Sequence, residues 1–262
     1  MKHKTFTLIT GASTGLGKEL ALACASQNRN LLLTALPGEK IEFVGEKIRK
    51  KYKIEVECYE VDLTQNGSVE KLSAEIFRKY EIDMLINNAG IGGTLSFMEA
   101  PPNYIDQIIL LNMRALVLLT RLLLPMLKKH QKSYILNIAS MASFGPMPFK
   151  TVYPASKAFV YSFSRGLGEE LKGTGISVSV AHPGGMKTNA EVTRRIEKHS
   201  KLIQLTTLPV KRIAEICIRQ TLRKDKLIIP GTMNKISWLM LKIIPVWLRL
   251  KIMRNSLQNE LK

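Results

Sequence analysis

Short apolar runs alternate with longer amphipathic segments along most of the chain. The short runs are four to eight residues long and rich in Val, Ile and Leu, as buried strands are; they cover 5–10, 30–35, 54–61, 82–86, 133–139, 175–181 and 226–229. The segments between them show helical periodicity and cover 18–27, 39–51, 68–80, 103–129, 153–172 and 210–222. This alternation predicts an α/β fold built on a doubly wound, parallel, seven-stranded sheet.

A different pattern begins at residue 232, where apolar residues, among them Trp238 and Trp247, become dense. Cations recur every seven positions at Lys235, Lys242 and Arg249, which would place them on one face of a single helix. The uninterrupted apolar run is too short to span a bilayer. A basic amphipathic helix fits a membrane surface, but also a helix packed over a pocket or at a dimer interface. We expect a single catalytic domain over 1–231 and a basic amphipathic helical tail over 232–262.

The charge is strongly positive and unevenly distributed. The 262 residues carry a formal net charge of +18, and residues 194–262 hold 16 Lys and Arg against 4 Asp and Glu. Such asymmetry predicts either an anionic partner or a solubilising basic surface. No basic–aromatic recognition motif accompanies it, so we expect lipid headgroups and no nucleic acid as the partner.

Cysteine usage excludes two classes of protein. The three cysteines, Cys24, Cys58 and Cys217, are widely spaced and form no Cys-x-x-Cys or Cys/His cluster. A disulfide framework or a metal site is therefore not expected. The residues before the first glycine motif hold no segment long enough for a cleaved signal peptide. We expect a cytoplasmic protein, peripheral on the inner face of a membrane.

A glycine-rich turn links the first predicted strand to the first predicted helix. Its glycines are Gly11, Gly15 and Gly17. Glycines here let the backbone approach a phosphate, and the helix N-terminus offers it free N–H groups and a positive dipole. This arrangement predicts a Rossmann-type dinucleotide site. The second strand, 30–35, and Leu36 directly after it hold no carboxylate of the kind that often binds a ribose 2′-hydroxyl. Lys18 and Lys40 are near in sequence, which favours NADP(H) over NAD(H).

Candidate catalytic side chains lie further along the chain. Tyr153 and Lys157 are four residues apart, so a helix would place them on one face. A cation beside a phenol lowers its pKa and makes it usable as an acid or base. Ser140 follows the fifth strand, at the sheet edge where ligands bind in such folds. Asn112, inside an apolar helix, is either a hydrogen-bonded core amide or an active-site amide.

These motifs together resemble the classical short-chain dehydrogenase/reductase family. The matching residues, in the family's order and spacing, are Thr10-Gly11-xxx-Gly15-x-Gly17, Asp62, Asn87-Asn88-Ala89-Gly90, Asn112, Ser140, Tyr153-xxx-Lys157 and Pro183-Gly184-xxx-Thr188. The resemblance covers about residues 5–231. One such motif would be a weak signal, but all of them in register are a strong one.

The resemblance implies a role for each matched position. It implies catalytic roles for Asn112, Ser140, Tyr153 and Lys157. It implies cofactor contacts for Gly11, Ser13, Thr14, Gly15, Leu16, Gly17, Leu36, Asp62, Leu63, Asn88, Ala89, Gly90, Tyr153, Lys157, Pro183, Gly184 and Thr188. It further implies a variable substrate lid at about 185–208 and a homodimer that packs through the helices at 103–129 and after Tyr153.

The sequence thus predicts an NADP(H)-dependent oxidoreductase. It would transfer a hydride between the nicotinamide and a lipophilic carbonyl or alcohol substrate. The alternative is a catalytically idle NADP-binding scaffold or regulator on the same fold. An idle site has no physical need to keep Ser140, Tyr153, Lys157 and Asn112 together, which argues for the enzyme.

Overall fold

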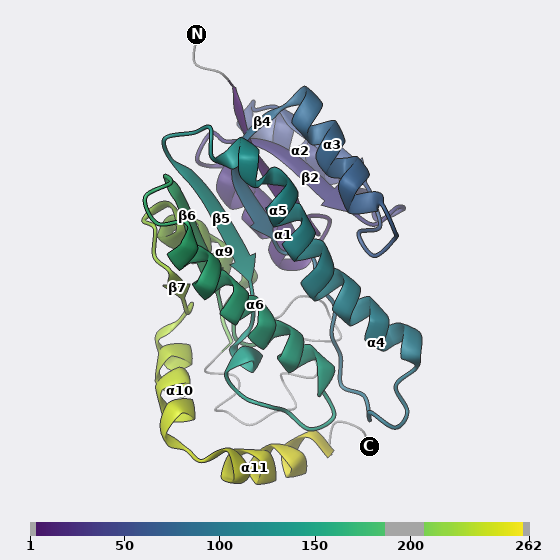
Figure 1. Ribbon diagram of the computed structural model, residues 1–262, viewed down its shortest axis with the longest axis vertical. Coiled ribbons are helices and arrows are strands. Elements are labelled where there is room, and N and C mark those ends of the chain that lie inside the picture. The colour runs from purple at the N-terminus through teal and green to yellow at the C-terminus, as the bar shows by residue number, and fades with distance from the viewer. Residues whose placement is uncertain (1–3, 187–206, 259–262) are drawn as a thin grey trace.

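Seven parallel strands form one sheet in the computed structural model, which describes residues 4–186 and 207–258 (Figure 1). The spatial order is β3-β2-β1-β4-β5-β6-β7. The strands are β1 (Thr5–Thr10), β2 (Asn30–Ala35), β3 (Val56–Glu60), β4 (Glu81–Asn87), β5 (Ser133–Ile138), β6 (Ile176–Ala181) and β7 (Leu227–Ile228). The predicted fold class is confirmed. Because the order reverses between β1 and β4, a crevice opens at their carboxyl ends.

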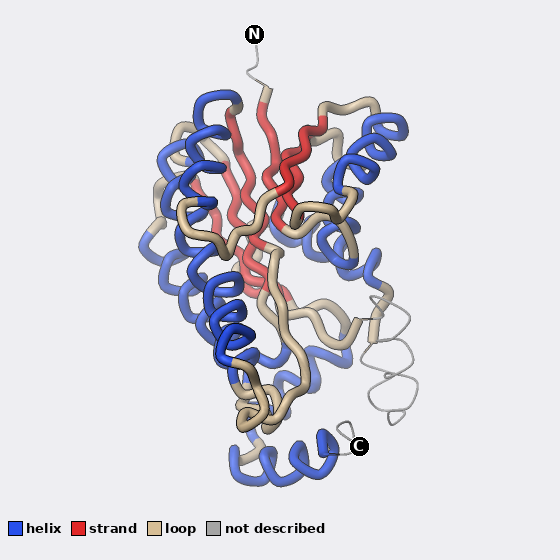
Figure 2. The backbone as a smooth tube through the Cα atoms, turned by 90° about the vertical axis from the view of Figure 1, so that its right-hand side faces the viewer, coloured by secondary structure: helices blue, strands red, loops and turns tan. Residues whose placement is uncertain are grey.

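Helices cover both faces of the sheet, so the molecule has three layers (Figure 2). One face packs against α1 (Gly15–Ala25), α2 (Ile41–Tyr52) and α9 (Val210–Leu222). The other packs against α3 (Ser68–Lys79), α5 (Leu116–Leu127) and α6 (Val152–Glu170). Burial on both faces explains why the strands are continuous apolar runs.

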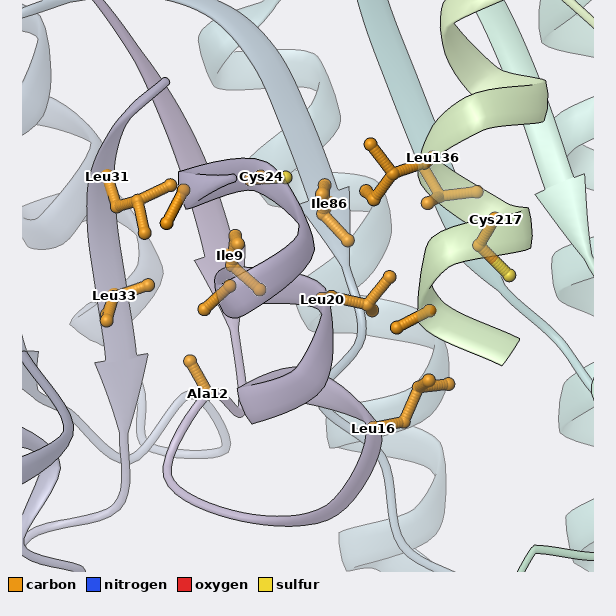
Figure 3. Close-up of a cluster of buried hydrophobic side chains, with 14 of the residues drawn as sticks. Ile9, Ala12, Leu16, Leu20, Cys24, Leu31, Leu33, Ile86, Leu136 and Cys217 are labelled. Carbon is orange, nitrogen blue, oxygen red and sulfur yellow. The ribbon is translucent and has the colours of Figure 1, made fainter. Parts of the chain in front are cut away.

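The first of these cores shows how the helical periodicity is used (Figure 3). Leu16, Leu20 and Cys24 are spaced by four residues on α1 and face the sheet. Cys24 and Cys217 are fully buried free thiols, and burial raises the pKa of each to about 12. They therefore pack as small apolar side chains.

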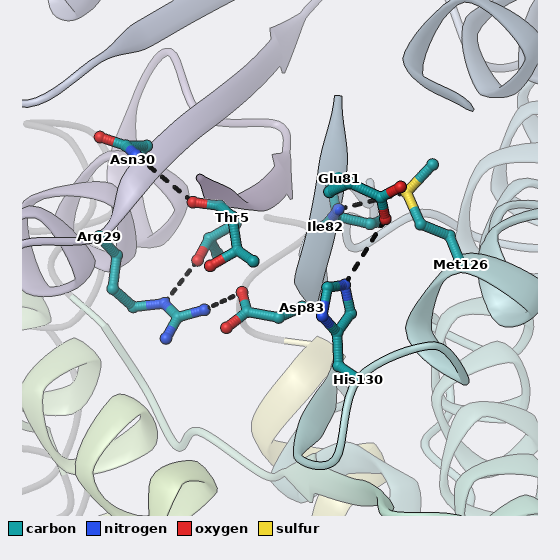
Figure 4. A network of polar contacts seen from close by, with 9 residues as sticks. Thr5, Arg29, Asn30, Glu81, Ile82, Asp83, Met126 and His130 are labelled. Carbon is teal, nitrogen blue, oxygen red and sulfur yellow. Dashed lines mark hydrogen bonds and ion pairs between the residues drawn. The ribbon is translucent and has the colours of Figure 1, made fainter. Parts of the chain in front are cut away.

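Polar contacts fasten the amino-terminal edge of the sheet (Figure 4). Arg29 precedes β2, forms an ion pair with Asp83 of β4, and donates from Nε to Thr7 Oγ1 at 2.7 Å. His130 Nε2 lies 3.7 Å from a carboxylate oxygen of Glu81. These contacts join three neighbouring strands at the edge opposite the crevice, which leaves the carboxyl ends available for ligands.

The predicted helix at 103–129 is a continuous helical rod with an irregular centre. It consists of α4 (Pro102–Ile109), a π-helical segment (Leu110–Ala115) and α5. In length and composition, Pro102–Leu127 is the one helix of the described chain that could cross a membrane. However, Leu119, Leu123 and Leu127 are fully buried against the sheet, as in the core helix of a globular domain.

The tail differs from the single helix that the sequence predicts. It forms α10 (Thr232–Ile243) and α11 (Val246–Gln258), which lie beyond the carboxyl ends of the strands (Figure 1). Ile244 is extended (φ −73°, ψ 125°) because a residue before proline disfavours helical backbone, and Pro245 follows it. The prediction that Lys235, Lys242 and Arg249 share one helical face was therefore wrong.

Candidate active site

A cleft of about 860 Å³ opens at the carboxyl ends of the central strands. It runs from the glycine turn after β1 to the start of α6. Thirteen of the predicted site residues line it: Gly11, Ser13, Thr14, Gly15, Leu16, Gly17, Leu36, Leu63, Asn88, Ala89, Gly90, Tyr153 and Lys157. Segments far apart in sequence thus form one elongated pocket.

The glycine turn presents a helix N-terminus to this cleft. Gly11 (φ +65°) and Gly15 (φ +53°) adopt left-handed backbone that other residues rarely take. Thr14 caps α1 without a side-chain hydrogen bond, so the first-turn N–H groups of the helix keep no capping partner. A Cβ atom on Gly17 would lie 1.9 Å from Gly11 O, which explains why glycine is needed there. Free N–H groups and the helix dipole fit a dinucleotide pyrophosphate.

The segment after β4 holds this turn in place. Asn88 Nδ2 donates to Thr10 O at 2.9 Å and to Gly11 O at 3.0 Å. Thr10 Oγ1 accepts from the backbone N–H groups of Asn88 and Ala89, each at 3.0 Å. The Asn-Asn-Ala-Gly motif therefore braces the end of β1, beside its predicted contact with the cofactor.

The carboxyl group of Asp62 forms hydrogen bonds within its own turn. Burial pushes the pKa of its carboxyl group up, but hydrogen bonds from Thr64 and Gln65 outweigh burial and hold it below its usual range. Its carboxylate fastens the turn after β3, and its neighbours Val61 and Leu63 line the cleft. Asp62 itself is absent from the lining residues.

Glu39 is a lining residue that the sequence reasoning missed. It lies three positions beyond Leu36, and its carboxylate accepts a hydrogen bond from Ser13 Oγ. A carboxylate was expected only at the last residues of the second strand. Pro37-Gly38, a strong turn signal, could have shown that the chain folds back to the cleft after the strand.

Tyr153 stands at the other end of the cleft. Its ring packs so closely on Gly92 that a Cβ atom there would lie 2.2 Å from Tyr153 Cδ2. Burial raises the pKa of Tyr153, and its hydrogen bond with Ser140 partly opposes that rise. The expectation of a lowered Tyr153 pKa is wrong for the protein alone, because burial is the largest influence on this pKa and raises it.

Lys157 is buried one turn along α6. Its Nζ donates to Ile138 O at 3.0 Å, and burial lowers its pKa to about 8. At neutral pH the side chain therefore remains mostly protonated. A Cβ atom on Gly90 would lie 3.1 Å from Lys157 Nζ, so the glycine leaves room for the ammonium at the cleft wall.

Asn112 lies in the π-helical segment, an irregularity that is frequent at functional sites. Its Oδ1 accepts from Ile91 N at 2.9 Å. Its Nδ2 donates to Ile91 O at 2.9 Å and to Ser156 Oγ at 3.0 Å. Asn112 is buried and is absent from the lining residues, so in this structure it ties the loop after Gly90 to α6.

Ser140 begins a 3₁₀ turn (Met141–Phe144) that a buried histidine supports. His182 Nδ1 lies 2.7 Å from Ser143 Oγ and 3.1 Å from Ser140 O. Burial lowers the pKa of His182 to about 4, so its imidazole is neutral at neutral pH. His182 follows β6 and was not predicted as a site residue; only its place directly before Pro183-Gly184 hinted at it.

The tail contacts the same turn. The Phe144 ring stacks on His182 with centroids 4.4 Å apart and lies 6.1 Å from the ring of Trp238 in α10. Arg249 of α11 donates from Nη1 to Phe144 O at 3.1 Å. The two tail helices therefore pack behind the loop that carries Ser140.

The Pro-Gly motif after β6 is only partly in the cleft. Pro183 O accepts from Met141 N at 3.0 Å, and Gly184 packs against Asn234 of α10. Gly185 and Met186 line the cleft in their place. Thr188 and most of the predicted lid at 185–208 lie outside the described residues, although a parallel bridge joins Met186 to Leu208.

Comparison with known proteins identifies the family. The family model described as short chain dehydrogenase matches residues 5–199. The chain belongs to the short-chain dehydrogenase family. The chain resembles the solved structure of a bulky-bulky ketone specific alcohol dehydrogenase from Comamonas testosteroni, to which it is 28% identical. The TM-score is 0.79, and the match covers 91% of this chain and 90% of that one. Another is a short-chain dehydrogenase from Sphingobium yanoikuyae in complex with NADPH, also 28% identical with a TM-score of 0.79, over 91% and 92% of the two chains.

A curated relative adds a named activity. The short-chain dehydrogenase is 35% identical over 179 residues to a very-long-chain 3-oxoacyl-CoA reductase from Phaeosphaeria nodorum. The match covers 66% of this chain and 52% of the relative. The chain thus matches about half the length of this relative.

Proposed function

We propose that the protein is an NADP(H)-dependent oxidoreductase that transfers a hydride between the nicotinamide and a lipophilic carbonyl or alcohol substrate. One observation carries the proposal: Tyr153, hydrogen-bonded to Ser140, lines one end of a cleft together with Lys157, and the other end of this cleft is a pyrophosphate-type glycine turn. The bound cofactor would supply the hydride. The protein would supply orientation and the proton.

The side chains at this end of the cleft divide the chemistry. Ser140 and Tyr153 would donate hydrogen bonds to the substrate carbonyl oxygen and stabilise the negative charge that develops there. Tyr153 would deliver the proton, and with the cofactor bound the positive charges of Lys157 and of the oxidised nicotinamide would together assist its loss. Asn112 would hold a water that relays protons to Lys157, and its contact with Ile91 keeps it beside Gly90.

For the cofactor, we propose that NADP(H) is favoured over NAD(H). The Sphingobium structure, 28% identical, contains NADPH. Leu36, at the end of β2, offers no charge that would oppose a 2′-phosphate. We also propose contacts on the nicotinamide side from Pro183, Gly184 and Thr188. At the adenine end, Asp62 would shape the pocket.

For the substrate, we propose a 3-oxoacyl thioester with a long acyl chain. The support is the activity named for the Phaeosphaeria relative and the bulky ketones named for the Comamonas enzyme. Consumption of NADPH should be measured by absorbance with 3-oxoacyl thioesters of increasing chain length, beside steroid and retinoid carbonyls. We expect kcat/KM to rise with acyl length. Turnover of only short or cyclic ketones would contradict the substrate, and turnover of none would contradict the oxidoreductase.

The tail, residues 232–262, is proposed as a membrane-contacting unit appended to the catalytic domain of residues 1–231. Large apolar side chains stay exposed along it: Ile236, Leu239, Met240, Ile243, Val246, Trp247 and Ile252. Residues 232–258 contain five Lys and Arg and no Asp or Glu. Exposed Trp and Ile beside uncompensated cations fit an anionic lipid surface, at the inner face of a membrane.

Substitutions on the exposed face test this contact without disturbing the packed side. The variant Ile243→Glu/Trp247→Glu changes two side chains that are 77% and 68% exposed. We expect it to bind anionic phosphatidylglycerol vesicles roughly tenfold or more weakly than the unaltered protein, because each side chain contributes apolar burial. Co-sedimentation at two salt concentrations measures this. The control is Phe77→Glu on α3, which is 46% exposed and lies outside the tail. Equal binding by all three proteins would refute the membrane contact.

We also propose a homodimer through the rod of α4 and α5 together with α6. Only 39% of the most apolar window of Pro102–Leu127 is buried within the chain, which leaves apolar surface for a second copy. A solution mass near the 29.5 kDa of one chain would contradict it.

A further inference from the structure

The 3₁₀ turn that follows Ser140 contacts the tail through residues outside the lining of the cleft. The turn ends at Phe144, whose carbonyl oxygen accepts a hydrogen bond from Arg249 Nη1 of α11 at 3.1 Å. A Cβ atom on Gly145 would lie 2.9 Å from the same Nη1, so the guanidinium rests on the backbone of the turn. None of Phe144, Gly145 and Arg249 is among the described residues that line the cleft.

The guanidinium of Arg249 is placed for this contact. Within the part of the chain that the structure describes, Arg249 forms no ion pair, and its Nε is buried without a hydrogen-bond partner. A buried donor that stays unpaired costs free energy, so the packing of α11 alone does not favour an arginine here. What the arginine adds is the hydrogen bond to the turn.

His182 joins Phe144 to Ser140. The Phe144 ring stacks on the His182 imidazole with centroids 4.4 Å apart, and the ring of Trp238 in α10 lies 6.1 Å from that of Phe144. His182 is fully buried, and its Nδ1 lies 3.1 Å from Ser140 O and 2.7 Å from Ser143 Oγ. Because these contacts follow one another, a displacement of Phe144 removes support from the peptide group of Ser140.

The hydroxyl of Ser140 depends on the same turn. Its Oγ accepts a hydrogen bond from Ala142 N at 3.1 Å and is also hydrogen-bonded to Tyr153. A turn that loosened at Phe144 would therefore misalign the two hydroxyls that we expect to meet the substrate carbonyl. Misplacement by about 1 Å, even from a distant change, can lower a rate by roughly 10²-fold.

We propose that Arg249 is a positioning residue for hydride transfer: it holds the Phe144 end of the turn and so keeps Ser140 aligned with Tyr153. This inference rests on the proposed function. Arg249 lies outside the lining of the cleft, so it acts through the turn and not on the substrate. The tail thereby gains a role at the active site in addition to the proposed membrane contact.

The test compares Arg249→Met with the unaltered protein in steady-state kinetics without lipid, so that membrane contact plays no part. Methionine keeps an apolar side chain and removes the donor. With NADPH and a long-chain 3-oxoacyl thioester, we expect kcat to fall by about tenfold or more. The NADPH dissociation constant should stay within about twofold, because the glycine turn lies at the other end of the cleft. NADPH deuterated at the transferred position should show a larger isotope effect on kcat, since a misaligned Ser140 slows the hydride step itself.

Two matched variants accompany this measurement. Arg249→Lys keeps a cation that can donate to Phe144 O, and it should recover kcat to within about threefold of the unaltered protein. Arg219→Met removes an exposed arginine from α9, outside the lining of the cleft, and should change neither kcat nor the isotope effect. Should Arg249→Met not fold, Arg249→Gln takes its place with the same expected result, because its amide is too short to reach Phe144 O.

The outcomes separate this inference from the proposed function. A kcat within about twofold of the unaltered protein in Arg249→Met would overturn the role of Arg249 alone. So would an equal loss in Arg219→Met, an unchanged isotope effect, or an Arg249→Lys protein as slow as Arg249→Met. NADPH binding that weakened as much as kcat fell would also overturn it, since the loss would then be structural. If the unaltered protein reduces no carbonyl compound, the proposed function fails, and this inference fails with it.

Discussion

Replacement of Tyr153 by Phe should lower kcat by roughly 10²–10⁴-fold, the range for loss of a general acid. The substitution removes the hydroxyl that bonds to Ser140 and keeps the ring that packs on Gly92. The cleft should therefore keep its shape, and NADPH should still bind. The measurement is kcat for NADPH consumption together with the NADPH dissociation constant.

A matched control variant shows whether the loss of kcat is specific to the Tyr153 hydroxyl or follows the removal of any tyrosine hydroxyl. Tyr134→Phe removes a hydroxyl from β5, on a residue that packs at the edge of the core and lies outside the lining of the cleft. It should keep kcat within about twofold. If Tyr153→Phe retained more than a tenth of the activity, Tyr153 would not be the proton donor. Loss of both activity and NADPH binding would indicate a collapsed cleft instead.

Replacement of Gly17 by Ala should remove cofactor binding and destabilise the fold. The new Cβ atom would lie 1.9 Å from Gly11 O and 2.5 Å from Asn88 Nδ2, and the first of these is backbone. Overpacking of this kind costs about 1–3 kcal/mol, and each kcal/mol corresponds to roughly 2–4 °C in Tm for a protein of this size. We expect a Tm lower by about 2–12 °C and NADPH binding weaker by at least tenfold.

Gly166→Ala on α6 is the matched control, because alanine fits there without a clash. A Cβ atom there meets nothing within 4 Å, and its backbone is helical. Alanine in a helix interior is favoured over glycine by about 0.5–1 kcal/mol, so this variant should raise Tm slightly and leave NADPH binding unchanged. Thermal melts with and without NADPH measure both effects. A Gly17→Ala protein that melted and bound like the unaltered one would contradict the close packing of the glycine turn.

The sequence predicts those parts of the molecule that depend on local pattern. The strands are apolar runs because both faces of the sheet are buried. The glycine turn could be predicted because its left-handed backbone strongly favours glycine. Tyr153 and Lys157 could be paired because helical spacing is regular. Thr188 lies outside the described residues, so its prediction stays untested.

Most of the features that were missed depend on contacts between segments that are distant in sequence. One depends on the local effect of proline on the residue before it. Glu39 reaches Ser13 only through the turn that joins β2 to α2, and His182 supports Ser140 across 42 positions of sequence. The pKa of Tyr153 depends on burial, which a sequence does not reveal. The break at Pro245, by contrast, could have been predicted, because proline disfavours helical backbone in the residue before it.

Because the strands of the sheet are parallel, the two ends of the molecule differ: the cleft opens at one end only. β1 begins at the amino-terminal edge, beside the contacts of Arg29, whereas α11 lies beyond the opposite edge, against Phe144 (Figure 1). An affinity tag or a sensor-chip tether placed ahead of β1 would leave the mouth of the cleft facing the solution. The same attachment after α11 would crowd the helix that packs behind Ser140. The choice of attachment end should therefore decide whether an immobilised preparation can still bind its ligands.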